Sequence, residues 1–428
     1  MDPSPSPAKR QRTDDGGGGP TQLTNDTAET NDIETYEYAT IDDGTAETND
    51  IETYEYATID DGASAAATAA LKKDKKIKGQ FYTVKSSYIL DGLPPPSEMA
   101  HRVIEPFAGK GDLVEWVRQS GSALPIELYD IEPKAKGTVW RDTLMDPPSY
   151  NDSWIITNPP YLARNKCETK VVFDKYDTND LYKCFITSLT QQKEGCVGGI
   201  FIIPAGFFFS PRELDVRCRN DFLSKYKLLK VKYFEEKVFP DTTTTVVAFA
   251  FEKSPVELTQ QLVEWISMPT GKKRVFQMNK TDDWIIGGDI YKLPVHADIH
   301  IRRHVQGFLA KKKDDQTTFM TLNALDSGTK DGGRICLEYK KDFVYPAKDC
   351  SRTYATLCIA GLPAPLTAEE QVKLCADFNE MVDKKRAETW SLFLPQFRES
   401  KEYARKRIPF ELAYTIVQHL LSKKYGKI

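Results

Sequence analysis

The chain has 428 residues, enough for two or three domains, and a formal net charge of −4. Its eight cysteines form no CxxC pair, which argues against a disulfide framework and favours reduced thiols inside a cell. No apolar run approaches the roughly eighteen residues of a membrane span, and no apolar signal region follows the first residues. We therefore expect an intracellular protein without a membrane anchor.

The net charge conceals an asymmetry along the chain. Residues 1–70 hold 3 basic and 16 acidic side chains, which leaves 55 basic and 46 acidic side chains for residues 71–428. A basic body suits a partner that carries phosphates, although an ordinary solvated surface has a similar composition.

Residues 1–70 are predicted to be a disordered tail, because they contain a run of four glycines and few large aliphatic side chains. An 18-residue unit, Thr27–Gly44, repeats identically as Thr45–Gly62, and two copies are too few for a packed solenoid. The basic cluster Lys9–Arg12 resembles a nuclear import signal, but short clusters of this kind are more often solvated charge.

A strand, a glycine turn and a helix are predicted in that order within residues 103–117. Gly109 and Gly111 allow positive φ and a close approach of the backbone to a ligand. The turn has neither the GKS or GKT phosphate grip nor GxGxxG spacing. Glu105, at the end of the strand, suits an amino group better than a phosphate.

The tetrapeptide Asn158-Pro159-Pro160-Tyr161 follows an apolar strand predicted at residues 154–157. Prolines end the hydrogen-bond ladder of a strand because they have no N–H to donate. The turn would therefore lie at the carboxyl edge of the sheet, where open α/β sheets bind their ligands.

This turn suits methyl transfer to a conjugated amino group. The Asn158 side-chain oxygen and the Pro159 carbonyl can each accept one proton of an exocyclic amine, while the Tyr161 ring can stack on the ring that bears it. The nitrogen would become pyramidal, with a localised lone pair, and attack a methyl donor in line. Such orientation supplies up to roughly 7–11 kcal/mol.

Beside this turn, seven further segments resemble, in family order, the motifs of gamma-class DNA adenine-N6 methyltransferases, which use S-adenosylmethionine and include restriction-modification enzymes. The segments are residues 79–83, 105–111, 128–133, 141–142, 180–185, 198–204 and 238–251. The resemblance implies methyl transfer to an adenine flipped out of double-stranded DNA, because a stacked base cannot reach such a site. Phe239 is then expected to stack on the second face of that base, unless it is a core residue.

The resemblance also implies a cofactor site. Asp130 is expected to accept the ribose hydroxyls and Asp142 the adenine amine, with Thr83 and Glu105 at the methionine end. Phe107 and Phe185 would form apolar walls for the adenine ring, although a helix core position is an equal alternative for Phe185. The full set of expected cofactor-binding residues is Thr83, Glu105, Phe107, Gly109, Gly111, Asp130, Asp142 and Phe185.

Strands alternate with helices from residue 81 to 251, which predicts a parallel-rich α/β sheet of the Rossmann-like, class I methyltransferase type. We expect a disordered tail at 1–70, a catalytic domain at 71–254 and a mixed α/β DNA-recognition region at 255–428. The last region is mostly helical in pattern from 366 to 421. Its basic clusters are Lys311–Lys313, Lys384–Arg386 and Arg405–Arg407.

Other functions remain open. An NPPY turn also suits RNA adenine or a protein glutamine, and Asn rather than Ser at 158 favours adenine over cytosine. A non-catalytic, methyltransferase-like DNA-binding protein is a further alternative. No nuclease motif is evident, so any restriction endonuclease acting at the same site would be a separate protein.

A metal site is not expected. His296, His300 and His304 have the i, i+4, i+8 spacing of one helical face, which could hold a metal ion. No cysteine or acidic partner accompanies them, and exposed histidines on helices are more common than metal ligands.

Overall fold

The computed structural model describes residues 86–239, 244–305, 315–329, 333–345, 353–397 and 404–426. The expected disordered tail with its repeat and import-like cluster, Thr83 and the cluster Lys311–Lys313 lie outside the described residues. No helix of the described part is long and apolar enough to cross a membrane.

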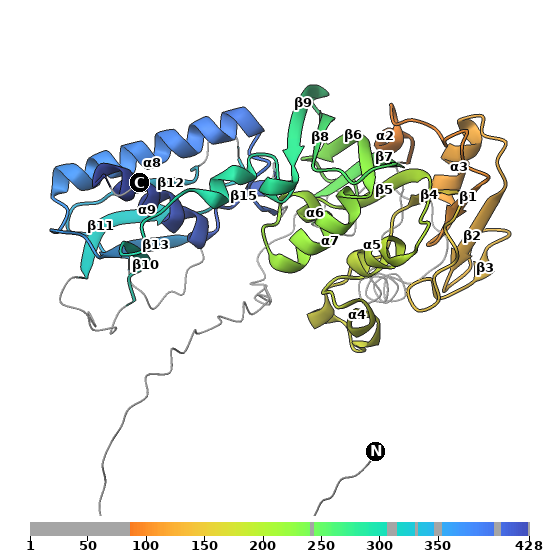
Figure 1. The fold of residues 1–428 in the computed structure, drawn as a ribbon, viewed down its shortest axis with the longest axis horizontal. Coiled ribbons are helices and arrows are strands. Elements are labelled where there is room, and N and C mark those ends of the chain that lie inside the picture. The colour runs from red at the N-terminus through yellow and green to blue at the C-terminus, as the bar shows by residue number, and fades with distance from the viewer. Residues whose placement is uncertain are drawn as a thin grey trace, which may run out of the picture. The chain divides into compact units, whose positions relative to one another are not determined.

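A large mixed sheet forms the first part of the described chain. Its strands are β1 (Arg102–Glu105), β2 (Ile126–Asp130), β3 (Val139–Trp140), β4 (Ser153–Thr157), β5 (Gly198–Pro204), β6 (Tyr226–Phe234), β7 (Val246–Lys253), β8 (Gln260–Met268) and β9 (Lys272–Asn279). Their order in the sheet is β3-β2-β1-β4-β5-β7-β6-β8-β9 (Figure 1). The strands from β3 to β5 pair in parallel, and β7 is antiparallel to both of its neighbours.

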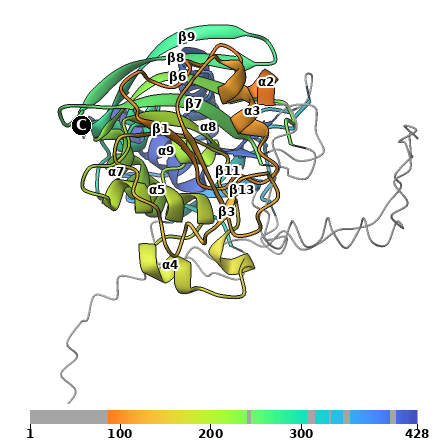
Figure 2. The same cartoon turned by 90° about the vertical axis from the view of Figure 1, so that its right-hand side faces the viewer.

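Helices cover both faces of this sheet. They are α2 (Ser86–Leu90), α3 (Asp112–Gln119), α4 (Val171–Tyr176), α5 (Leu181–Gln191), α6 (Gly206–Phe209) and α7 (Glu213–Leu223), with a 3-10 turn η1 (Arg164–Lys166). Figures 1 and 2 show α2 and α3 on one side and α5 and α7 on the other. Strands β4 and β5 are buried at every position, as expected for parallel strands covered on both faces.

The expected domain boundary at residue 254 falls inside this sheet. Strand β8 pairs in parallel with β6, and β9 pairs with β8, so the sheet continues to Asn279. The prediction missed these two strands because the methyltransferase resemblance ends at the preceding hairpin.

A smaller antiparallel sheet follows, with strand order β10-β13-β11-β12. Its strands are β10 (His300–Arg303), β11 (Gln316–Asn323), β12 (Cys336–Tyr339) and β13 (Tyr354–Ala360), preceded by the 3-10 turns η2 (Lys280–Asp282) and η3 (Gly288–Lys292). Two helices pack on it, α8 (Ala368–Thr389) and α9 (Phe410–Lys424), and they share its apolar core. A short ribbon joins β14 (Gln396–Phe397) to β15 (Arg405–Lys406).

The two helices confirm the helical pattern predicted between residues 366 and 421. Helix α8 starts at a capping box, in which the Thr367 side chain accepts from the Glu370 N–H and the Glu370 side chain accepts from the Thr367 N–H. Its buried side includes Leu374, Phe378 and Val382, which follow one another at intervals of four residues, as one face of a helix requires.

Candidate active site at the carboxyl edge of the sheet

The Asn158-Pro159-Pro160-Tyr161 turn lies at the centre of the large sheet. It directly follows β4, which is flanked on both sides by parallel strands, β1 and β5. The carboxyl ends of these strands meet at one edge, so the turn and the loop after β1 are neighbours there. Pro159 and Tyr161 are buried, whereas Asn158 is half-buried.

Tyr161 fixes the conformation of this turn. Its hydroxyl lies in hydrogen-bonding contact with the side-chain oxygen of Asn158 and donates to the carbonyl of Ile202, on β5, at 2.6 Å. Burial raises the pKa of the phenol well above its usual value, so the hydroxyl keeps its proton. The ring is 7% exposed and packs edge-on against Tyr182. Its stacking on a base stays a prediction.

The glycine turn after β1 takes the conformation expected of it. Gly109 has φ +51° and Gly111 has φ +85°, and α3 begins directly after Gly111. Asp130, at the end of β2, accepts the Gly109 N–H at 2.8 Å through Oδ2 and the Glu132 N–H at 2.7 Å through Oδ1. The Asp130 carboxylate therefore supports two adjacent turns.

Glu105 is a buried carboxyl group at the start of the same turn. It is 2% exposed, and its Oε2 has no hydrogen-bond partner among the described residues. Burial, followed by the charges of Asp112 and Asp130, raises the pKa of Glu105 well above its usual value. A ligand with an ammonium group would satisfy the unpaired oxygen and offset the surplus of negative charge.

Three other expected cofactor residues lie close by in the fold. Asp142 follows β3 and accepts the backbone N–H groups of the next turn through Oδ1. The half-buried ring of Phe107 packs edge-on against Phe185, with ring centroids 5.4 Å apart. Phe185 is fully buried on α5, and its role as a second wall of the adenine ring stays a prediction.

Phe239 is also buried in this structure. It is 2% exposed and belongs to the hydrophobic core of the large sheet. The strands β6 and β7 on either side of it form the expected hairpin. Stacking of Phe239 on a base would require the ring to leave this core, and that role stays a prediction.

Asp180 lies near Tyr161 and was not among the site residues predicted from the sequence. It immediately precedes α5, and its backbone pairs with Ala163, two residues after Tyr161. Its Oδ1 is buried without a hydrogen-bond partner among the described residues. Burial raises the pKa of Asp180 to about 6, although the Lys183 charge and the N–H groups of Tyr182 and Leu162 favour the ionised form.

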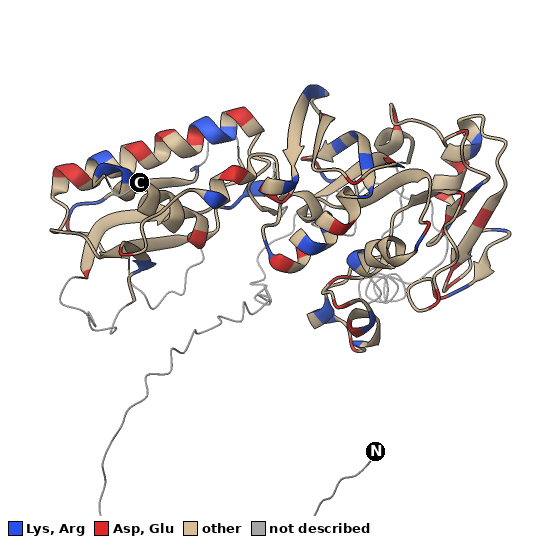
Figure 3. Cartoon of the chain, viewed as in Figure 1, with Lys and Arg blue, Asp and Glu red and all other residues tan. Residues whose placement is uncertain are grey.

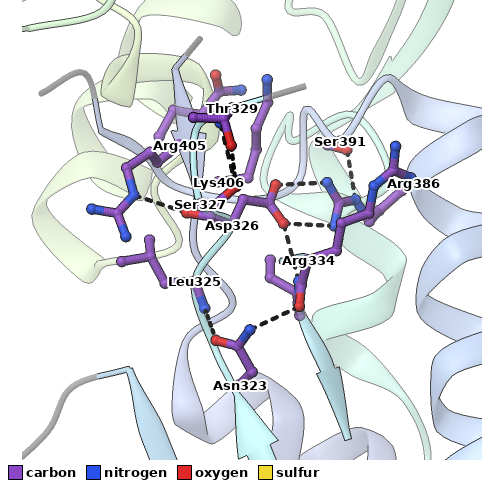
Figure 4. Close-up of polar contacts among 12 residues, drawn as sticks. Asn323, Leu325, Asp326, Ser327, Thr329, Arg334, Arg386, Ser391, Arg405 and Lys406 are labelled. Carbon is purple, nitrogen blue, oxygen red and sulfur yellow. Dashed lines mark hydrogen bonds and ion pairs between the residues drawn. The ribbon is translucent and has the colours of Figure 1, made fainter. Parts of the chain in front are cut away.

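Two of the basic clusters predicted from the sequence are partly used inside the protein. Arg386 and Asp326 form a two-pronged ion pair at 3.1 and 2.7 Å, and both side chains are largely buried (Figure 4). Lys385 pairs with Asp289. Lys406 pairs with a glutamate at the end of β6, Glu235.

The histidine spacing does not describe a helix. His300 is the first residue of strand β10, so the predicted helical face is wrong: a strand turns its side chains with period two rather than 3.6. No group of three or more potential metal ligands was found in the described part of the chain.

A family model described as the Eco57I restriction-modification methylase matches residues 153–239. The matched segment runs from β4 through the Asn158 turn to Phe239. The strand order of the large sheet from β3 to β6, with β7 antiparallel to its neighbours, resembles the class I methyltransferase fold. No curated protein matches the chain.

Solved structures also align with the chain. A modification subunit of a putative type I restriction enzyme from Vibrio vulnificus YJ016 is 16% identical, with a TM-score of 0.36, over 48% of this chain and 52% of that one. The type I restriction enzyme EcoKI M protein is 13% identical, with a TM-score of 0.34, over 75% and 74%. The chain thus spans about half the length of the first of these structures. At such scores the alignments add nothing to the topology described above.

Proposed function

We propose that the protein is a DNA adenine-N6 methyltransferase of the restriction-modification type that uses S-adenosylmethionine. The observation that carries this proposal is the Asn158-Pro159-Pro160-Tyr161 turn at the middle of a class I methyltransferase sheet, beside a glycine turn that buries an unpaired carboxyl oxygen. The family model over residues 153–239 supports the same chemistry. A separate restriction endonuclease would then recognise the same site.

The residues at hand fit this cofactor. The unpaired Oε2 of Glu105 would accept from the ammonium group of its methionine end. Asp130 would accept its ribose hydroxyls through the lone pairs that the backbone leaves free, since each carboxylate oxygen can accept more than one hydrogen bond. Asp142 would accept from its adenine amine. Phe107, supported by Phe185, would pack against its ring.

The catalytic work of the protein is to hold the adenine amine. Asn158 and the Pro159 carbonyl would accept its two protons, which localises the nitrogen lone pair and directs it outward. S-adenosylmethionine supplies the methyl group as an electrophile. Tyr161 would position the Asn158 amide through its hydroxyl and stack on the base, with Phe239 on the second face.

Double-stranded DNA is the proposed substrate because the body of the chain is basic and a second domain follows the catalytic sheet. Residues 255–428, or the part of them beyond the large sheet, would read the DNA sequence. RNA adenine and protein glutamine also present a nitrogen with a delocalised lone pair to the Asn158 turn. Both therefore serve as competing substrates in the test.

The test is incubation of the full chain with labelled S-adenosylmethionine and duplex DNA, RNA or a protein mixture, followed by nucleoside and amino-acid analysis. We expect label in N6-methyladenine from DNA and none with Asn158→Ala. Label only in RNA or in glutamine would replace the proposed substrate. Cofactor binding without transfer to any of the three would favour a non-catalytic DNA-binding protein.

A further inference from the structure

The β8–β9 hairpin extends the sheet beyond the segment that resembles methyltransferases. Strand β8 runs parallel to β6, with Phe234 opposite Met268. Because β6 and β5 are both antiparallel to β7, they run in the same direction. The turn between β8 and β9, at residues 269–271, therefore lies on the carboxyl edge, the edge that carries the Asn158 turn.

Three consecutive basic residues start β9 at this turn: Lys272, Lys273 and Arg274. All three are exposed. Within the described residues none of them forms an ion pair, whereas the exposed Lys227 and Lys253 of the same sheet do. Figure 3 shows the blue colouring that they give to the tip of the hairpin.

Aromatic rings hold two of these three basic side chains in place. The Lys272 ammonium lies 5.4 Å from the centre of the Trp390 ring, and the Arg274 guanidinium lies 5.0 Å from that of Phe276. The two rings pack edge-on at 5.1 Å, and Arg274 also approaches the Ala387 carbonyl at the end of α8. Such cation–π contacts hold the charges in place without neutralising them.

The third charge lies on the other face of the hairpin. Side chains alternate along a strand, so Lys272, Arg274 and Phe276 share one face, and Lys273 shares the opposite face with Val275. Among the described residues, Lys273 contacts neither Trp390 nor α8. It can therefore be removed without disturbing the packing of the hairpin on α8.

The nearby carboxylates are mostly paired with other cations. Glu235, at the end of β6, pairs with Lys406, and Glu264, on β8, pairs with Lys230. Asp289 pairs with Lys385. Glu388, near the end of α8, is exposed and lies four residues after exposed Lys384. The tip of the hairpin therefore keeps a positive field.

We propose that Lys272, Lys273 and Arg274 bind the phosphate backbone of the DNA duplex beside the methylation site. This proposal rests on the proposed function. In sheet order β9 is five strands from β4, on the order of 24 Å at about 4.8 Å per strand. That distance corresponds to roughly seven base pairs at about 3.4 Å each. The hairpin thus contacts DNA outside the pocket for the target base.

The experiment measures the affinity of the full chain for fluorescent duplex DNA of mixed sequence across a range of salt concentrations. The variants are Lys273→Ala and the double variant Lys272→Ala/Lys273→Ala. The control is Lys193→Ala, an exposed lysine in the connection from α5 to β5, at the amino edge of the sheet. Melting temperature and cofactor affinity are measured alongside to show that each variant is folded.

We expect the slope of log affinity against log salt to fall by about 0.9 for each phosphate contact removed. The slope should therefore fall in Lys273→Ala, fall further in the double variant and stay unchanged in Lys193→Ala. Equal slopes in wild type and double variant would overturn the proposal. A wild type that methylates no DNA would instead contradict the proposed function. A wild type that methylates DNA, with a double variant of the same salt slope, would contradict only the role of the hairpin.

Discussion

The hydroxyl of Tyr161 lies in contact with the side-chain oxygen of Asn158, three residues earlier in the same turn. The same hydroxyl reaches the Ile202 carbonyl on the neighbouring strand. The amide proposed to hold the adenine amine is thereby linked to the rigid centre of the sheet.

Replacing Tyr161 by Phe should slow methyl transfer while leaving cofactor affinity unchanged. The substitution keeps the ring but removes a hydrogen bond worth about 0.5–1.5 kcal/mol, which corresponds to a rate loss of roughly two- to tenfold. Tyr161→Ala should cost more, because base stacking contributes about 1–3 kcal/mol. Single-turnover methylation rates measure both effects, and a Phe variant as fast as wild type would exclude the positioning role.

Replacing Glu105 by Gln should reduce the loss of folding stability as pH rises and should weaken the binding of S-adenosylmethionine. Because folding raises the pKa of Glu105, its contribution to stability is present below the ordinary pKa and is lost as pH rises through the raised one. The Gln variant should therefore lose less stability than wild type as pH rises. It should bind S-adenosylmethionine roughly 10- to 100-fold more weakly, because a charge-assisted hydrogen bond of about 1.5–3 kcal/mol is lost.

Thermal unfolding at several pH values and calorimetric titration separate these two effects. Exposed Glu98→Gln is the matched control and should change neither. A Glu105→Gln protein with wild-type cofactor affinity would remove Glu105 from the cofactor site.

Replacing Asp180 by Asn should remove a loss of folding stability that the wild type shows between acid and neutral pH. Folding raises the pKa of this carboxyl from 3.8 to about 6, so the stability it contributes is present below its ordinary pKa and is lost as pH rises through about 6. The Asn variant should lack this step. Denaturant unfolding between about pH 4 and pH 8 measures it, and identical profiles for the two proteins would contradict the prediction.

Two glycine substitutions separate backbone strain from a local effect on the site. Gly111→Ala and Gly121→Ala both place a side chain at positive φ, +85° and +81°, and each should cost about 1 kcal/mol of stability. A Cβ at Gly111 would also lie 3.2 Å from the Cβ of Ala135, whereas Gly121 has open space. Only Gly111→Ala should weaken cofactor binding. Equal cofactor affinities of the two variants would show that the glycine turn does not contact the cofactor.

Breaking the Asp326–Arg386 pair should destabilise the C-terminal part of the protein strongly. Removing one partner of a buried ion pair leaves the other charge uncompensated, which costs about 3–5 kcal/mol. Asp326→Asn should show this loss in denaturant unfolding, while the exposed pair of Lys373 and Asp377 on α8 should contribute less than about 1 kcal/mol. Similar losses at the two sites would show that burial does not strengthen this contact.

The sequence was a good guide to the part of the fold that positions the site. Apolar runs bounded by glycine or proline predicted β1, β4 and β5, because a strand covered on both faces has no polar side. Strand β8 alternates exposed with buried positions only at its start, and β9 begins with four exposed residues, so their pattern was too weak to set a boundary.

Burial was the main feature that the sequence did not reveal. Phe185 and Phe239 were expected beside the ligands, with a core position as the alternative, and both are buried. An aromatic residue in a motif looks the same whether it faces a ligand or a neighbouring helix. Arg386 looked like part of a basic surface cluster. Its partner, Asp326, is 60 residues away in the chain, so no local pattern could predict the pair.

The backbone pairing of Ala163 with Asp180 closes the excursion that contains η1 and α4. The chain leaves the sheet just after the Asn158 turn and returns, at this closure, to the start of α5. Within the excursion, α4 buries Phe173 and Tyr176 in the core of the large sheet, whereas η1 buries no residue. A change of chain length near η1 should therefore leave the paths of β4 and α5 intact, and a change within α4 should not.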